Sequence, residues 1–544
     1  MKKKFSYLIL IYSLILTISV TAKTTAKSDL ETKIDALIPT EINGSTPGLV
    51  IGIVQKGKII FSKGYGLANL SYNIPNDSKI VYNTGSVSKQ FLGYAFAMLQ
   101  VQGQLNLDDA VGKYLENWPE FEHKVTLRHL LSHTSGYREA YTMSNLAGRV
   151  VGIDHLSRQE CLDVVRKQPE LEFVPGSRYT YNSTAWVILS EVLKKVTGQE
   201  SDQWVEENIF KPLKMDNTQI ESFVGEVINN AAESYAHEEE KGYVNYKSNR
   251  AIFGAAEVYS NIPDMVKWMN NLKTAKVGGK KVNELFLKPF VLTDGTNSEY
   301  ALGINNGSYK GLKRYRHTGG HEAFSTQLSY YPEHELGIFT VSNFGGKASV
   351  PTSKIADILL SEYLLDEVLN KYIETDKSQL ENFAGLYVSE SYNRTVELTM
   401  LDGVLQRGNT RLIPISENTF LYEGSDIKIQ IETNKDQTQL KPIDRAKQSY
   451  FKVKKWRPNE TDLKTYKGEY WSDELETVYH LTIKDNKLTV QHRWLGDMPL
   501  TPVAEDFFSA EWGMFVKFNR NGKNEISGLS VNSGRTLNVV FKLK

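Results

Sequence analysis

Residues 83–100 read Asn-Thr-Gly-Ser-Val-Ser-Lys-Gln-Phe-Leu-Gly-Tyr-Ala-Phe-Ala-Met-Leu-Gln. From Ser86 onward the stretch is rich in helix formers, with Ser and Thr at its entrance, and it predicts a long, largely buried helix. Ser86 and Lys89 are three residues apart, so they lie on one face of this helix. A lysine that is desolvated enough to be neutral can accept the proton of a serine hydroxyl. The pair therefore predicts a nucleophile, although an ordinary capped helix gives the same tetrapeptide by chance.

Strand patterns flank this helix in the sequence. Residues 48–61 contain two apolar runs around Gly57 and predict a β-hairpin, and residues 327–342 predict a second strand pair. Further helices are expected over residues 127–131, 185–196 and 265–272. Helices inserted between two groups of strands favour an α+β fold with an antiparallel sheet.

A second candidate motif is the loop Pro-Gly-Ser-Arg-Tyr-Thr-Tyr-Asn-Ser-Thr-Ala-Trp at residues 175–186. The Pro-Gly turn leads into an irregular segment that presents Tyr181 just before the next helix. A tyrosine beside a lysine ammonium has its phenolate favoured and can shuttle a proton. Packing of Tyr181 in the core is the alternative interpretation.

A third motif, Arg-His-Thr-Gly-Gly-His at residues 316–321, comes directly before the second strand pair. Its two glycines let the backbone approach a ligand closely, and its N–H groups are suited to an oxyanion hole. By itself a Gly-Gly pair indicates only a bulge or a bend.

In this order, the three motifs resemble the serine β-lactamase and penicillin-binding-protein superfamily, in which they line one cleft. The similarity to its class C-like branch continues through residues 64–69, 103–115 and 126–136 and covers roughly residues 30–370. The resemblance implies a β-lactamase/transpeptidase-like domain. It also implies that Ser86 is acylated, that Lys89 accepts its proton and that Tyr181 exchanges protons with the leaving group or the deacylating water.

Further site roles also follow from the resemblance. His317 matches the first position of the strand motif, and the backbone N–H groups of Ser86 and Gly320 match the oxyanion donors. Two departures narrow the expected activity. Ser183 replaces the asparagine of the Tyr-x-Asn motif and reaches less far than an amide. A neutral His317 is a poorer anchor for a carboxylate than the lysine that true β-lactamases carry.

These departures favour an esterase or a D-amino-acid peptidase over a true β-lactamase. The expected partner is a small-molecule ester, a peptide or a peptidoglycan-derived substrate, and no cofactor is expected. Two alternatives stay open. In the first alternative, the chain is a penicillin-binding-type protein that is acylated but barely turns over. In the second, it is a non-catalytic envelope-binding protein on this fold.

The C-terminal third contains an internal repeat of short alternating strands. The pattern Leu-x-x-Phe-x-Gly-x-Tyr-x-Ser at residues 380–389 returns as Leu-x-x-Tyr-x-Gly-x-Tyr-x-Ser at residues 463–472. We therefore expect two small antiparallel β-barrels or sandwiches, at 379–457 and 460–544, after a hydrolase domain at 23–373. This order resembles the D-aminopeptidase arrangement, and we hypothesise that the repeats cap the cleft. Aromatic residues in the second repeat predict either core packing or a sugar-binding face; they are Tyr466, Tyr470, Trp471, Tyr479, Trp494 and Trp512.

Composition limits the partners and the compartment. The 544 residues carry 64 basic and 64 acidic side chains, so no net field attracts nucleic acid, and nucleic-acid binding is not expected. Three lysines precede an apolar stretch over residues 7–20, and small residues follow it, which predicts a cleaved signal peptide at 1–22. We expect a periplasmic or secreted protein with no membrane span in its mature chain. The single Cys161 is expected to be a buried apolar residue, and His129 and His133 lack the third ligand that a metal site needs.

Overall fold

The structure is a computed structural model that describes residues 28–150, 153–250, 252–364, 373, 375–425, 427–434, 437–443 and 448–544. The chain divides into two units, Met1–Pro39 and Thr40–Lys544. In the first, helix α2 (Asp29–Asp35) is capped by Ser28, whose hydroxyl accepts from the N–H of Glu31. The expected signal peptide at 1–22 lies outside the described residues. In the ranges given above, no helix is both long enough and apolar enough to cross a membrane.

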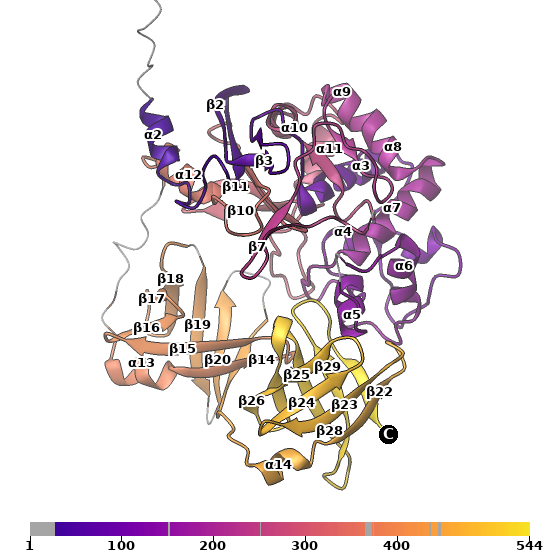
Figure 1. Cartoon of the computed structure of the whole chain (residues 1–544), viewed down its shortest axis with the longest axis vertical. Helices are drawn as coiled ribbons and strands as arrows, with labels where there is room; N and C mark the ends of the chain where they lie inside the picture. Colours follow the sequence, from indigo (N-terminus) through magenta and orange to yellow (C-terminus); the bar gives the residue numbers. More distant parts are fainter. Residues whose placement is uncertain are drawn as a thin grey trace, which may run out of the picture. The chain divides into compact units, whose positions relative to one another are not determined.

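An antiparallel sheet organises the first domain of the larger unit (Figure 1). The expected hairpin forms its strands β1 (Leu49–Gln55) and β2 (Lys58–Tyr65), and the turn between them has a positive φ of 78° at Gly57. Strand β1 also pairs with β13, so the N-terminal hairpin closes against the later strand group. Within the described residues the sheet has six strands, in the order β10 (Asn305–Tyr309), β11 (Leu312–His321), β12 (Phe324–Tyr331), β13 (Leu336–Ser342), β1 (Leu49–Gln55) and β2 (Lys58–Tyr65).

Helices cover both faces of this sheet. On one face, α10 (Ile262–Thr274) packs so closely that a Cβ at Gly52 would lie 2.4 Å from Ile262. On the other face, α12 (Thr352–Leu359) reaches the sheet through the Thr352 hydroxyl, which lies 2.8 Å from that of Ser329. The expected α+β fold is therefore confirmed.

The central helix α3 (Lys89–Val101) is buried from Lys89 to Leu99, as its apolar sequence predicts. A short 3-10 turn, η1 (Gly85–Ser88), precedes it and carries Ser86. The expected helix at 185–196 is α7 (Thr184–Thr197), which ends at Gly198 with φ 72°. The other helical elements of this domain are η2 (Val111–Lys113), α4 (Leu127–Leu131), α5 (Ala140–Leu146), α6 (Arg158–Arg166), α8 (Ser201–Val205), η3 (Glu206–Phe210), α9 (Lys211–Leu213) and α11 (Lys280–Phe286). Cys161 on α6 is a buried free thiol, as expected.

In the part of the first domain that the structure describes, three small sheets accompany the large one. One of them leads to the candidate nucleophile: β9 (Val258–Ser260) pairs with both β5 (Tyr82–Asn83) and β6 (Gln219–Ile220), and β5 runs directly into the turn that carries Ser86. The strands are β5 (Tyr82–Asn83), β9 (Val258–Ser260) and β6 (Gln219–Ile220), with pairs β3 (Leu67–Asn69) and β4 (Ile74–Pro75), and β7 (Tyr235–Glu238) and β8 (Gly242–Asn245).

Two β domains follow, drawn in orange and yellow in Figure 1. The first begins with helix α13 (Lys377–Phe383) and is a closed barrel. Its strands are β14 (Gly385–Ser389), β15 (Thr395–Leu401), β16 (Val404–Arg407), β17 (Thr410–Pro414), β18 (Thr419–Tyr422), β19 (Lys428–Asn434), β20 (Gln437–Ile443) and β21 (Tyr450–Val453).

The second β domain begins with helix α14 (Glu460–Lys464) and forms one continuous antiparallel sheet around its own core. A short turn, η4 (Glu511–Gly513), interrupts the strands. They are β22 (Gly468–Ser472), β23 (Thr477–Lys484), β24 (Lys487–His492), β25 (Gly496–Pro499), β26 (Thr501–Ala504), β27 (Phe507–Ser509), β28 (Phe515–Arg520), β29 (Ile526–Asn532) and β30 (Val539–Leu543).

The internal repeat is visible in the two β domains as matching local structure. In each domain a short helix leads into a strand whose tyrosine hydroxyl donates to a carbonyl four residues earlier. The bonds run from Tyr387 to Phe383 at 2.7 Å and from Tyr470 to Tyr466 at 2.9 Å. The strand registers also match, because Gly385 pairs with Leu398 and Gly468 pairs with Leu481.

The six aromatic residues of the second repeat differ in burial, and Trp471 on β22 is half-buried. Tyr466, Tyr470 and Tyr479 are buried in the domain core, in agreement with the packing interpretation. Trp494 and Trp512 are 65% and 68% exposed, so they lie on the surface of the domain. The six aromatics therefore do not form one sugar-binding face.

The second β domain is docked on the first domain through apolar and charged contacts. Met143 and Leu146 of α5 belong to the apolar core of the second β domain. Next to them, the buried Arg138 guanidinium pairs with Glu172 at 3.2 Å and with Glu474 at 2.7 Å. A buried charge is costly unless it is paired. These ion pairs therefore favour the one arrangement of the first domain and the second β domain in which Arg138 is paired.

Candidate active site

The Ser86 hydroxyl and the Lys89 amine lie side by side at the entrance of α3. Nζ of Lys89 is 3.2 Å from Oγ of Ser86 and donates to the carbonyl of Ala255 at 2.5 Å. Strand β9 supports the turn, because the N–H of Val258 donates to Ser88 Oγ and the N–H of Thr84 donates to Val258 O. The half-buried Ser86 thus faces a fixed amine.

Lys89 is fully buried, and burial lowers its pKa from 10.5 to about 7. The carboxyl groups of Glu139 and Glu257 act against this decrease, whereas the positive charge of Arg535 adds to it. A lysine with a pKa near neutrality carries a substantial neutral fraction, which can take the proton of a neighbouring hydroxyl. The arrangement therefore has the chemistry of an activated serine nucleophile.

Tyr181 lies over the lysine, with its ring centroid 5.1 Å from Nζ. Its loop is held by His133, whose Nδ1 accepts from the N–H of Asn182 at 2.9 Å and whose ring packs against the Tyr181 ring with 4.1 Å between the ring centroids. Burial raises the pKa of Tyr181, and the neighbouring Ser86 hydroxyl opposes that increase. The two hydroxyls are not in hydrogen-bond geometry here, and the phenol has no partner among the described residues. Tyr181 is therefore a neutral phenol that faces the nucleophile.

His133 takes part as a packing residue in this cluster. Its backbone has a positive φ of 59°, and burial lowers the pKa of its imidazole well below the ordinary value. A neutral ring with one nitrogen committed to Asn182 holds the Tyr181 loop by a tilted ring contact and by one hydrogen bond.

Glycines bring the strand motif against the turn that carries Ser86. A Cβ at Gly319 would lie 2.1 Å from the carbonyl oxygen of Thr84, and one at Gly85, where φ is 55°, would lie 2.6 Å from the N atom of Gly320. Only residues without a side chain permit this approach of two backbones. The N–H groups of Ser86 and Gly320 therefore come from adjoining segments, as an oxyanion hole requires.

His317 is a neutral residue whose two ring nitrogens are both occupied. Its Nδ1 donates to the carbonyl of Thr318 at 2.6 Å, so its Nε2 accepts from the buried Tyr300 hydroxyl at 2.9 Å. Burial and the charge of Lys89 lower the pKa of His317 to about 3. In this arrangement His317 offers no positive charge and no free N–H to a substrate.

Glu139 is a site residue that sequence patterns did not indicate. Its buried carboxylate accepts from the backbone N–H of Ser183, and its second oxygen has no partner within the described residues. Burial raises the pKa of Glu139, while Arg535 and Lys89 oppose the increase. In the described part of the chain, Ser183 joins the site through its N–H, and no hydrogen bond links its hydroxyl to Lys89. The only sequence signal was the place of Glu139, three residues after the Thr126–Gly136 stretch.

A second buried carboxyl lies behind the lysine. Glu257 precedes β9 with a positive φ of 76°, and one of its oxygens accepts from the N–H of Ala256 at 3.0 Å. Burial raises the pKa of Glu257 to about 7. The neighbouring charge of Lys89 acts against that shift.

Arg535 reaches the site from the loop between β29 and β30 of the second β domain. Its guanidinium carbon lies 5.0 Å from the ring centroid of Tyr181. The next residue, Thr536, accepts from the backbone N–H of Glu139 at 3.3 Å. No local pattern marks Arg535, because its role depends on the docking of two domains.

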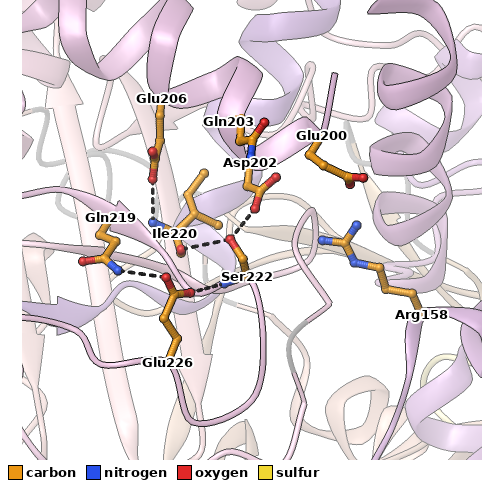
Figure 2. A pocket seen from close by; sticks show the side chains of 9 residues that line it. All are labelled: Arg158, Glu200, Asp202, Gln203, Glu206, Gln219, Ile220, Ser222 and Glu226. Carbon is orange, nitrogen blue, oxygen red and sulfur yellow. Dashed lines mark hydrogen bonds between the residues drawn. The ribbon is translucent and has the colours of Figure 1, made fainter. Parts of the chain in front are cut away.

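A separate hollow of about 530 Å³ lies beside α8 and β6 (Figure 2). Its carboxylates are mostly occupied within the chain, for example Asp202 by the Ser222 hydroxyl and Glu226 by the N–H of Ser222. It contains none of the site residues expected from the sequence. Among the residues that the structure describes, no group of three or more His, Cys, Asp or Glu side chains could hold a metal ion.

The chain belongs to the beta-lactamase family, whose profile matches residues 29–361, more than half of its length. A D-aminopeptidase of Cereibacter sphaeroides is 25% identical over 329 residues, which are 60% of this chain and 62% of that protein. Penicillin-binding protein 4* of Bacillus subtilis is 25% identical over 308 residues, 53% of this chain and 66% of that protein. The match thus spans less than two thirds of either relative.

Solved structures show the same fold. The octameric penicillin-binding protein homologue from Pyrococcus abyssi has a TM-score of 0.52 at 21% identity, over 77% of this chain and 98% of that one. The D-amino acid amidase from Ochrobactrum anthropi SV3, complexed with D-phenylalanine, has a TM-score of 0.51 at 18% identity, over 62% and 100%. These findings confirm the resemblance that the three motifs indicated.

Proposed function

We propose that this protein is a serine hydrolase that cleaves an amide, peptide or ester bond through an acyl-enzyme on Ser86. The observation that carries the proposal is the buried Lys89 amine, 3.2 Å from Oγ of Ser86 and with a pKa of about 7. The relatives named D-aminopeptidase and D-amino acid amidase support a D-amino-acid peptide or amide as the substrate.

The chemistry divides into two steps. In the first, Ser86 Oγ attacks the substrate carbonyl while Lys89 takes its proton, and the oxyanion is bound by the N–H groups of Ser86 and Gly320. Tyr181 then passes its phenol proton to the leaving amine or alcohol and regains a proton from Lys89, which returns to its neutral form. In the second step, a water attacks the carbonyl of the acyl-enzyme and gives up a proton to Lys89 through Tyr181. The bond between Ser86 Oγ and the acyl carbon then breaks, and this proton returns to Ser86 Oγ as the acid product leaves. Glu139 orders this site by holding the N–H of Ser183, next to the Tyr181 loop.

The neutral His317 supports a peptidase or an esterase over a true β-lactamase. Its nitrogens are occupied by Thr318 and Tyr300, so it supplies no cation to a β-lactam carboxylate. This is the reason to test three reagent classes side by side.

The test is the intact mass of the protein after exposure to a fluorophosphonate, a penicillin and an activated acetyl ester. We expect one adduct on the wild type and none on Ser86→Ala, and the reagent whose adduct decays indicates the substrate class. A penicillin adduct that never decays favours the protein that is acylated without turnover. Absence of every adduct from the wild type contradicts the proposal.

We also propose that the protein is exported and that its mature chain consists of a hydrolase domain at 23–373 and β domains at 379–457 and 460–544. The basic and apolar N-terminal pattern supports export, and the repeat supports the domain limits. The mass of the protein recovered outside the cytoplasm tests this. A mass that still includes residues 1–22 contradicts cleavage.

A further inference from the structure

A cavity of about 580 Å³ is lined by residues of all three domains. Tyr141 and Asn145 of α5 contribute from the first domain, Tyr450 from the first β domain and Trp512 from the second. The cavity is lined by both aromatic and polar side chains, as is usual for sites that bind organic ligands.

The charge of this cavity is of one sign. Arg394 and Arg407 from the first β domain and Arg535 from the second line it, and none of the Asp and Glu residues that the structure describes does. Within the described residues, none of the three guanidinium groups has an ion-pair partner. Burial raises the pKa of Tyr450, and the charges of Arg394 and Arg407 both oppose that increase, so both act on the same point in the cavity. Such a concentration of unpaired guanidinium groups attracts anions.

Arg535 connects the cavity to the nucleophile. Its guanidinium carbon lies 5.0 Å from the ring centroid of Tyr181, and its charge lowers the pKa of Lys89. The Ser533 hydroxyl accepts from the N–H groups of Arg535 and Thr536, both at 3.2 Å, and this fixes the turn that carries the arginine. A ligand group bound by Arg535 would therefore sit beside the scissile bond.

We propose that the substrate carries an anionic group, a carboxylate or a phosphate, which binds Arg535 together with Arg394 and Arg407 in this cavity. The inference rests on the proposed function of Ser86. The anchor comes from the second β domain because His317, on the sheet, has both nitrogens occupied. Guanidinium groups bind carboxylate and phosphate oxygens through paired hydrogen bonds, so they suit both groups.

The first test compares two anilides that differ in one charge, N-succinyl-D-alanine p-nitroanilide and N-butyryl-D-alanine p-nitroanilide. A phosphonoacetyl analogue distinguishes phosphate from carboxylate recognition. We expect wild type to favour an anionic anilide by about 10-fold or more in kcat/KM, and Arg535→Gln to lose most of that preference. Arg457→Gln, an exposed arginine outside the cavity, is the matched control and keeps it. Equal preference in wild type and Arg535→Gln overturns the inference.

The second test does not depend on turnover. Calorimetry on Ser86→Ala measures the binding of glutarate and of inorganic phosphate at constant ionic strength. We expect at least one of the anions to bind, and its affinity to fall about 10-fold or more when Arg535→Gln is added. No binding of either anion, or binding that Arg535→Gln leaves unchanged, overturns the inference even where Ser86 is acylated. Anion binding without any acylation of wild type instead contradicts the proposed function alone.

Discussion

Lys89 has a pKa near neutrality because burial outweighs the two carboxyl groups that face it. Acylation of Ser86 needs the neutral amine, and the neutral form increases as pH rises through the pKa of about 7. We therefore predict that the rate of fluorophosphonate labelling rises with pH around a midpoint of about 7. The measurement is the labelling rate followed by intact mass across that range. A rate that falls with rising pH would mean that the lysine acts as a cation.

The charged groups around Lys89 predict that two substitutions shift the pKa of this lysine in opposite directions. Arg535 lowers its pKa and Glu139 raises it, while the buried His133 and His317 stay neutral because burial lowers their own pKa values. Arg535→Gln should therefore move the labelling midpoint to higher pH, and Glu139→Gln should move it to lower pH. The pH profile of each variant checks this. Midpoints that move in the same direction would show that these charges do not set the lysine pKa.

Ser86 is the proposed nucleophile and Lys89 its base, so each supplies a group that turnover requires. We predict that Ser86→Ala abolishes turnover and that Lys89→Ala lowers kcat/KM by about 10²- to 10⁴-fold, as expected when a general base is lost. Steady-state hydrolysis of the D-alanine anilides measures both effects. Wild-type rates in either variant would refute the assignment.

At the scale of elements, the strand β11 and the turn η1 are in backbone contact. A methyl group at Gly319 would lie 2.1 Å from the Thr84 carbonyl, so Gly319→Ala must push the strand away from Ser86. We predict a loss of about 10²- to 10³-fold in kcat/KM, the effect of disturbing an oxyanion donor. Gly522→Ala, where a new Cβ meets nothing within 4 Å, is the control in the same assay. If Gly319→Ala kept the kcat/KM of the wild type, the oxyanion hole would have to lie elsewhere.

The elements themselves could be predicted because their signals are local. Ser86 and Lys89 meet through helical spacing, and the hairpin around Gly57 follows from two apolar runs and a turn. Glu139 and Arg535 could not be predicted in this way. Their approach to Lys89 depends on tertiary packing between segments far apart in the chain, and no sequence period describes such packing.

At the scale of the whole molecule, the repeat predicted the strands of the β domains but not how they dock. The contact depends on Arg138, which is 2% exposed and satisfies two buried carboxylates. Arg138→Ala leaves Glu172 and Glu474 unpaired, so we predict a loss of about 3–5 kcal/mol in the free energy of unfolding. Denaturant unfolding measures it.

The interface between the first domain and the second β domain also contains a second ion pair that serves as a control. The exposed pair of Lys167 and Glu476 also joins the two domains, at 2.9 Å, and exposed pairs contribute only about 0–1 kcal/mol. Lys167→Ala should therefore leave the unfolding curve nearly unchanged. Equal effects of Lys167→Ala and Arg138→Ala would show that burial of the Arg138 network does not stabilise the docked arrangement.

The central claim is that Ser86 carries the acyl group during turnover. It is tested most directly by quenching the reaction with a D-alanine ester in acid and measuring the mass of the peptide that contains Ser86. We predict a transient increase by one alanyl group in the wild type, a longer-lived one in Tyr181→Phe, and none in Ser86→Ala. Turnover that persists in Ser86→Ala, with no modified peptide in the wild type, would contradict this account.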